Sequence, residues 1–84
     1  TYEECMAFEL QRRDLFVQRQ YAIPIIYKGN QLNQNYCIDL LVNNEVIIEL
    51  KSVKKIEPIH NAQLLTYLKL ANKRFGLLLN FNVS

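Results

Sequence analysis

The chain has 84 residues, half of them apolar and about a fifth charged, with a formal net charge of +2. This length excludes two independent hydrophobic cores, so we expect a single domain over residues 1–84. The mixed charges exclude intrinsic disorder, and the net charge is too small to identify a partner. No apolar run approaches the roughly 18 residues of a membrane span, so we expect no membrane association.

The two cysteines, Cys5 and Cys37, lie far apart and form no CxxC pair. Two ordinary buried thiols are the favoured interpretation, and a disulfide or a metal role is the alternative. This usage favours a reducing, intracellular and cytoplasmic setting. The sequence also opens inside what reads as a running helix, so part of the natural N-terminus is expected to be missing.

The first part of the chain changes from helical to strand periodicity. Residues 3–14 predict an amphipathic helix with Met6 and Leu10 on its apolar stripe. Residues 16–27 are rich in strand formers. Pro24 removes a backbone donor, which indicates that this strand lies at a sheet edge or is bent there.

Two more strands follow, each introduced by a turn signal. Residues 28–30 read Lys-Gly-Asn and predict a reversal into a strand that runs through residues 36–42. A second turn at residues 43–44 leads into a strand over residues 46–53. Three consecutive strands of this kind form an antiparallel meander.

The last part of the chain predicts one helix and one strand. Helical spacing of Leu65 and Leu68 supports a helix from about residue 59 to residue 73, and Gly76 ends the following turn. Residues 77–81 are a short apolar strand, which the crossover helix allows to join the sheet in parallel. The predicted fold is therefore α+β, an αβββαβ core with a mixed four-stranded sheet and flanking helices.

Two acids and a lysine interrupt strands that are otherwise apolar. Asp39 precedes the second turn, and Glu49 and Lys51 follow it; acids are rare inside sheets unless they are paired or bound to a cation. A three-residue loop, 43–45, places Asp39 opposite Glu49 and puts Ile38 on a wholly aliphatic face. A two-residue loop would mix charge into that face, so the pattern favours the first register.

This arrangement points to metal-assisted chemistry. Two carboxylates about 4 Å apart repel by roughly 4 kcal/mol at an effective dielectric of about 20. Mg²⁺ relieves this repulsion and provides an activated water for attack on a phosphate, and Lys51 on the same side can stabilise developing charge. The alternative is a solvated strand face with an Asp39–Lys51 salt bridge, and the spacing alone leaves it open.

Read as a whole, the sequence resembles the GxxExxR proteins, a branch of the PD-(D/E)XK nuclease superfamily. The resembling segments cover nearly the whole chain: Tyr2-Glu3-Glu4, Glu9-Leu10, Ile23-Pro24, Tyr27-Lys28-Gly29, Tyr36, Asp39-Leu40-Leu41-Val42, Glu49-Leu50-Lys51, Pro58-Ile59-His60, Ala62-Gln63-Leu64-Leu65-Thr66-Tyr67-Leu68, Gly76-Leu77-Leu78 and Asn80-Phe81-Asn82. The resemblance implies a restriction-endonuclease-like core and a metal-dependent nuclease that acts on DNA rather than RNA.

The resemblance also implies roles for single residues. Asp39 and Glu49 would hold Mg²⁺ or Mn²⁺, and Lys51 would assist the attacking water. Gln63 and Tyr67 match the QxxxY signature of RecB-like relatives and share one helix face. Without the resemblance, Gln63 reads as an exposed amide and Tyr67 as a half-buried core ring.

Some positions depart from the family pattern. The family's glycine-containing opening and its first-helix glutamate are largely absent; Glu3 is the nearby substitute, or else a surface acid. Lys54 and Lys55 are candidate nucleic-acid contacts or a solvated turn, and His60 reads as a cap or surface imidazole rather than a general base. A catalytically inactive module that binds nucleic acid or a protein is therefore the alternative function, and a homodimer through the edge strand near residues 25–27 is a further hypothesis.

Overall fold

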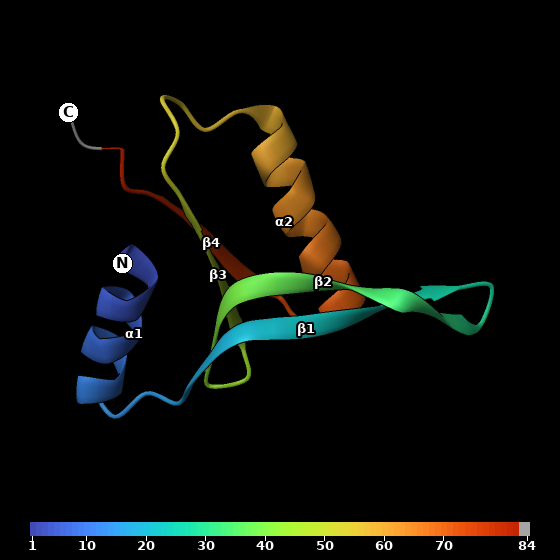
Figure 1. The fold of residues 1–84 in the computed structure, drawn as a ribbon, viewed down its shortest axis with the longest axis horizontal. Helices are drawn as coiled ribbons and strands as arrows, with labels where there is room; N and C mark the ends of the chain where they lie inside the picture. The colour runs from blue at the N-terminus through green and yellow to red at the C-terminus, as the bar shows by residue number, and fades with distance from the viewer. Residues whose placement is uncertain (83–84) are drawn as a thin grey trace.

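The computed structural model describes residues 1–82, which form two helices and one four-stranded sheet (Figure 1). The elements in chain order are α1 (Tyr2–Arg12), β1 (Val17–Tyr27), β2 (Asn30–Val42), β3 (Val46–Lys51), α2 (Pro58–Ala71) and β4 (Phe75–Asn80). The sheet order is β1-β2-β3-β4, with β1–β2 and β2–β3 antiparallel and β3–β4 parallel. This confirms the predicted mixed α+β fold.

The two helices cover opposite faces of the sheet. Successive strand residues point to opposite faces, and accordingly Leu40 and Ile48 pack with Ala7 of α1, whereas Leu41 and Ile47 pack on the α2 side. The α2 side chains in that second cluster are Leu64, Tyr67, Leu68 and Ala71. Each helix thus holds β2 and β3 from its own side.

The helix ends follow their sequence signals, but the core-facing side of α2 does not match the predicted stripe. Thr1 caps α1 by accepting a hydrogen bond from the Glu4 amide at 3.2 Å. Pro58 occupies the first turn of α2, and Asn72 ends the helix in a left-handed conformation with φ 56°. Leu65, expected to face the core, is 59% exposed, so that part of the prediction is wrong.

At one position along the hairpin of β1 and β2, the side chains switch from one face of the sheet to the other. Gln20 has a left-handed φ of 49°, and the β1–β2 pairs continue on both sides of Gln20 and Asp39 but omit these two residues. Ile38 therefore packs with Ile47 on the α2 side, not with Leu40 on the α1 side. The predicted wholly aliphatic face is wrong for Ile38, because the alternation of side chains along β2 is broken at Asp39, where the pairing with β1 is interrupted.

Two residues that break regular structure have clear roles. β1 is an edge strand, as Pro24 predicted, and its register with β2 shifts between Pro24 and Ile26. Gly76 lies inside β4 and not in a turn. A Cβ atom there would be 2.9 Å from Leu64 Cδ1, so this glycine lets α2 pack closely on the sheet.

The cysteine prediction is half right. Cys5 and Cys37 are both free, as expected of ordinary thiols, but both are exposed and not buried. Over residues 1–82, no helix has both the length and the apolar character needed to cross a membrane.

Candidate functional site

The two acids on β2 and β3 meet across the strands, and each carboxylate accepts a hydrogen bond from a backbone amide of the opposite strand. The β2–β3 ladder runs in the predicted register and ends at the pair Leu40–Ile48. One step beyond, the Asp39 amide donates to Glu49 Oε2 at 2.7 Å and the Leu50 amide donates to Asp39 Oδ2 at 2.8 Å. This reciprocal pair fixes both carboxylates while leaving one oxygen of each free of these two bonds.

Glu49 is held where its charge is unfavourable. It is only 5% exposed and is the buried charged residue of the core. Burial raises the pKa of Glu49, and the neighbouring Asp39 charge raises it further, while the Asp39 amide and the Lys51 charge lower it. A cation bound beside Glu49 would stabilise its charged form, which burial and the Asp39 charge disfavour.

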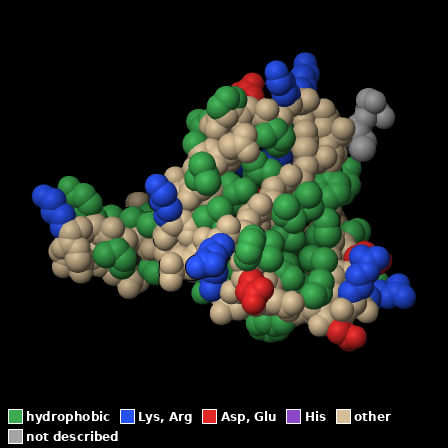
Figure 2. All heavy atoms as spheres, turned by 180° about the vertical axis from the view of Figure 1, so that it is seen from behind, with side chains coloured by type: hydrophobic (Ala, Val, Ile, Leu, Met, Phe, Trp, Pro, Cys, Tyr) green, Lys and Arg blue, Asp and Glu red, His purple; other side chains and the backbone are tan. Residues whose placement is uncertain are grey.

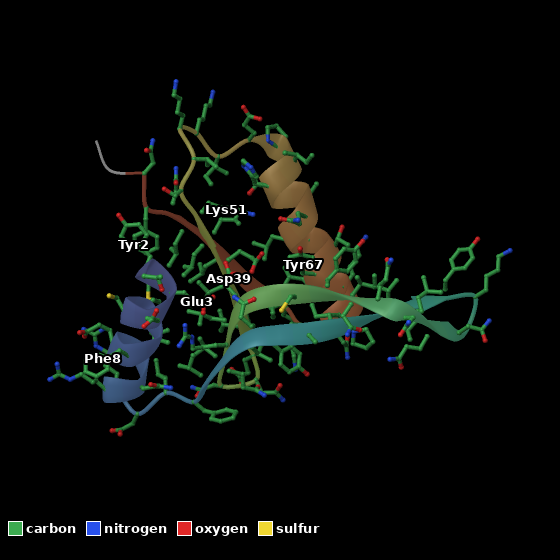
Figure 3. All side chains as sticks on the ribbon, in the orientation of Figure 1. Tyr2, Glu3, Phe8, Asp39, Lys51 and Tyr67 are labelled. Atoms are coloured by element: carbon green, nitrogen blue, oxygen red, sulfur yellow. The ribbon has the colours of Figure 1, made fainter. Side chains whose placement is uncertain are left out.

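Lys51 and Gln63 approach this pair from β3 and α2. Lys51 Nζ donates to Gln63 Oε1 at 3.2 Å, which joins the end of β3 to the exposed face of α2. Figure 3 shows Lys51, Asp39 and Tyr67 near one another, between β3, β2 and α2. The structure therefore brings Asp39, Glu49, Lys51 and Gln63 into one region, as the spacing and the resemblance predicted.

Tyr67 lies one helical turn after Gln63, in the core cluster between α2 and the sheet. It is 6% exposed, and its ring centroid is 5.4 Å from that of Tyr36. Burial raises the pKa of the Tyr67 hydroxyl, and the charge of Glu49 adds to the effect. Tyr67 is thus a core residue that also borders the acid pair.

Glu3 joins the site through a residue that the sequence did not indicate. Glu3 Oε2 accepts hydrogen bonds from Arg19 Nε at 2.9 Å and Nη2 at 2.7 Å. Its other oxygen accepts from Gln20 Nε2, which also lies 3.4 Å from Asp39 Oδ1. The Gln20 amide therefore bridges the α1 acid and the β2 acid.

Sequence reasoning missed Arg19 and Gln20. Both stand in a polar stretch of β1 that reads as an ordinary edge strand. The left-handed φ of Gln20 turns its side chain toward α1, and no residue type in that stretch signals such a conformation. The available hint was an arginine with no charged neighbour in sequence, on the strand that pairs with the strand of Asp39.

The comparisons with known proteins agree with this geometry. The whole sequence, residues 1–84, matches the PD-(D/E)XK nuclease superfamily. The chain belongs to this superfamily. No curated protein and no solved structure matches the chain. PD-(D/E)XK nucleases generally use divalent metal ions, so the acid pair must be tested for its fit to such an ion.

The donor atoms of the acid pair fit a hard divalent cation. Within the described residues, Glu49 Oε1 has no hydrogen-bond partner and Asp39 Oδ1 has only the 3.4 Å contact with Gln20. Carboxylate oxygens are the ligands that Mg²⁺ and Mn²⁺ prefer, and Mg²⁺ usually takes one or two of them and fills its remaining positions with water or phosphate oxygens. No group of three or more His, Cys, Asp or Glu residues that could hold a metal occurs in the described part of the chain.

The remaining predicted residues lie outside this cluster. Lys54 and Lys55 are exposed on the loop between β3 and α2, and no side-chain bond links them to the acid pair over residues 1–82. His60 Nδ1 accepts a hydrogen bond from the Glu57 amide at 2.9 Å. The imidazole therefore caps the start of α2, as predicted.

Proposed function

We propose that this chain is a metal-dependent nuclease that hydrolyses phosphodiester bonds, with DNA as the substrate and Mg²⁺ or Mn²⁺ as the cofactor. The observation that carries the proposal is the reciprocal Asp39–Glu49 pair with Lys51 two residues further along β3. Superfamily membership supports nuclease chemistry. The choice of DNA rests on the resemblance to the GxxExxR proteins.

Each residue of the pair has a separate task in this proposal. A divalent ion supplies Lewis-acid chemistry when bound, because it neutralises phosphate charge and makes a nearby water more acidic. Asp39 and Glu49 provide the oxygens that hold it. One oxygen of each carboxylate accepts a bond from the Asp39 or Leu50 amide, and this holds the other oxygen in a fixed position for the ion.

Lys51 is proposed to stabilise the negative charge that grows on the phosphate oxygens during hydrolysis. Its ammonium is positioned by Gln63, and a preorganised cation costs no reorganisation at the moment of reaction. Gln63 and Tyr67 fit the QxxxY signature in this role: Gln63 orients Lys51, and the buried Tyr67 supports Gln63 from one turn below. These assignments support membership of the RecB-like branch.

Glu3 is proposed as the acid that stands in for the family's first-helix glutamate. Its side chain is 19% exposed and reaches Asp39 through the shared Gln20 amide. In this role it positions Asp39 and borders the substrate, while Lys54 and Lys55, on the loop between β3 and α2, contact the phosphate backbone.

The test is a cleavage assay on labelled DNA with purified chain and Mg²⁺ or Mn²⁺. Asp39→Asn and Lys51→Ala are each expected to reduce the rate by about a hundredfold or more, because each removes preorganised charge. Lys69→Ala, which changes an exposed lysine on the same helix as Gln63, serves as the control and should cleave at the wild-type rate. Wild-type rates in either site variant would contradict the proposal.

A binding module without catalysis is the second candidate. The observation that favours it is the double hydrogen bond from Arg19, which occupies one oxygen of Glu3 and leaves two carboxylates for a metal. Calorimetric titration with Mn²⁺ separates the candidates. Uptake that disappears in Asp39→Asn supports the nuclease, and no uptake by the wild-type chain supports the module.

A further inference from the structure

The hairpin of β1 and β2 extends well beyond the body of the protein. We use the name hairpin arm for residues 24–35, which lie past Ile23, the last buried residue of β1, and its partner Tyr36. Figure 1 shows the arm projecting away from both helices. Its strands pair again at the tip, after a register shift between Pro24 and Ile26 that leaves residues 32–34 without partners. Lys28 and Gly29 form the turn with φ values of 51° and 78°, the signature of a tight two-residue hairpin.

The arm is exposed and unsupported. Apart from the half-buried Ile25, every residue of the arm is exposed, including apolar Ile26 at 53% and Tyr27 at 59%. An isolated two-stranded hairpin is only marginally stable in water. The arm therefore presents a long, ordered surface that a partner would stabilise.

The arm is rich in amides, carries no acid and has one charged residue, Lys28. Residues 15–38 contain no Asp or Glu, and Figure 2 shows no acidic side chain on the arm. The second strand of the arm carries five amides: Asn30, Gln31, Asn33, Gln34 and Asn35. Among the described residues, only Asn30 uses its side chain, in a 3.4 Å bond to the Lys28 carbonyl.

Exposed amides on a ribbon without acids suit the grooves of a nucleic acid duplex. Each amide offers donors and an acceptor, the groups that base edges present, and Asn or Gln pairs with adenine in two hydrogen bonds. A surface without carboxylates does not repel phosphates. A strongly charged protein partner would instead require several charged side chains, and the arm carries only Lys28.

The dimensions of the arm agree with this partner. The shorter of its two strands, residues 24–27 of β1, extends about 13 Å at roughly 3.3 Å per residue. The major groove of duplex DNA is about 8.5 Å deep and about 12 Å wide, and it admits a two-stranded ribbon. The arm is long enough to reach the groove floor while the body stays outside.

The arm and the acid pair share one strand. Asn35 and Asp39 are four residues apart on β2, which is about 13 Å along the strand. We propose that the hairpin arm enters a groove of duplex nucleic acid and so makes the duplex, not a single strand, the substrate presented to Asp39, Glu49 and Lys51. This inference rests on the nucleic-acid substrate of the proposed function.

The test measures binding with one added negative charge on the arm. Gln31→Glu and Gln34→Glu each keep the side-chain shape, and Gln11→Glu, on exposed α1, is the matched control. Binding of a labelled duplex and of its single strand is followed by fluorescence anisotropy in EDTA, so that nothing is cut. Each arm variant is expected to bind the duplex about tenfold more weakly, with single-strand binding and the control within about twofold of wild type.

Three outcomes decide the inference. Selective loss of duplex binding in the arm variants supports it. Equal loss for duplex and single strand, or no loss for the duplex, overturns it. A change in solution mass on Gln31→Glu, measured by sedimentation, also overturns it, because the arm would then be a contact between two copies through the edge near residues 25–27.

A parallel cleavage assay separates this inference from the proposed function. If wild-type chain cuts DNA through Asp39 and Lys51 while Gln31→Glu cuts the duplex at the same rate, the nuclease stands and the arm proposal fails. If no metal-dependent cutting occurs but duplex binding depends on Gln31, the nuclease fails and the arm proposal stands.

Discussion

The two ends of strand β2 lie in opposite environments. From Asn30 to Cys37 every residue is exposed, whereas from Ile38 to Val42 every residue except the half-buried Asp39 is buried. The same pair of strands thus forms a free arm at one end and the centre of the sheet at the other. Asp39 stands at the boundary between the two.

This contrast explains where the candidate site lies. A catalytic carboxylate must be fixed by its surroundings and must also meet the substrate. The buried end supplies the fixed surroundings, since Asp39 is bonded to β3 on one side and to Gln20 on the other. The open end leaves the approach to Asp39 free.

The largest difference in the free energy of unfolding is expected when an isoleucine is truncated at the buried end of the hairpin and at its exposed end. Ile38 is fully buried and Ile26 is 53% exposed. Ile38→Ala is expected to lower the free energy of unfolding by about 2–5 kcal/mol because it leaves a cavity. Ile26→Ala should lower it by about 1 kcal/mol or less, a loss of strand propensity alone. Urea unfolding followed by circular dichroism measures both, and equal losses would show that the arm is packed in solution.

The left-handed backbone of Gln20, at the boundary between the two ends, can be tested by replacing this residue with glycine and with alanine. Gln20 has a φ of 49°, which costs an L-residue about 1 kcal/mol and glycine almost nothing. Both substitutions remove the bridge between Glu3 and Asp39, so Gln20→Gly should be more stable than Gln20→Ala by about 1 kcal/mol.

Gln18 provides the control for this comparison. It lies two residues earlier on β1 in ordinary extended backbone. There glycine should be less stable than alanine by about 0.5–1 kcal/mol, since glycine loses more freedom on folding. The same order of stability at both positions would mean that the strands do not switch face at Gln20 in solution.

The sequence predicted the parts of this protein that depend on residue pattern. Alternating apolar residues and the Asn43-Asn44 turn set the β2–β3 register, and that register brings Asp39 to Glu49. The positive φ at Gln20 has no signature in residue type, so the position of Ile38 and the bridge to Glu3 could not be predicted. Helical spacing alone predicted Leu65 on the core side of α2, but Leu64 packs against Gly76 there and Leu65 is exposed.

The buried end should also respond to pH through Glu49. The pKa of Glu49 is raised above its ordinary value of 4.5, chiefly by burial and then by Asp39. The folded state therefore favours the protonated acid, and this stabilisation is lost as pH rises through the folded pKa. Without divalent ions, Glu49→Gln should gain stability relative to wild type as pH rises from 4 to 8. A difference between the two proteins that stays constant over this range would contradict the raised pKa.

The smallest effect on stability is expected from the amides of the arm. Asn33 is exposed, and its side chain makes no hydrogen bond within the described residues. Asn33→Ala should therefore change the free energy of unfolding by no more than about 0.5 kcal/mol in either direction. Thermal and urea unfolding of the purified variant give this value directly. A larger loss would mean that Asn33 is bonded within the fold, and the amides of the arm would then serve stability at the open end of β2 just as the apolar residues do at the buried end.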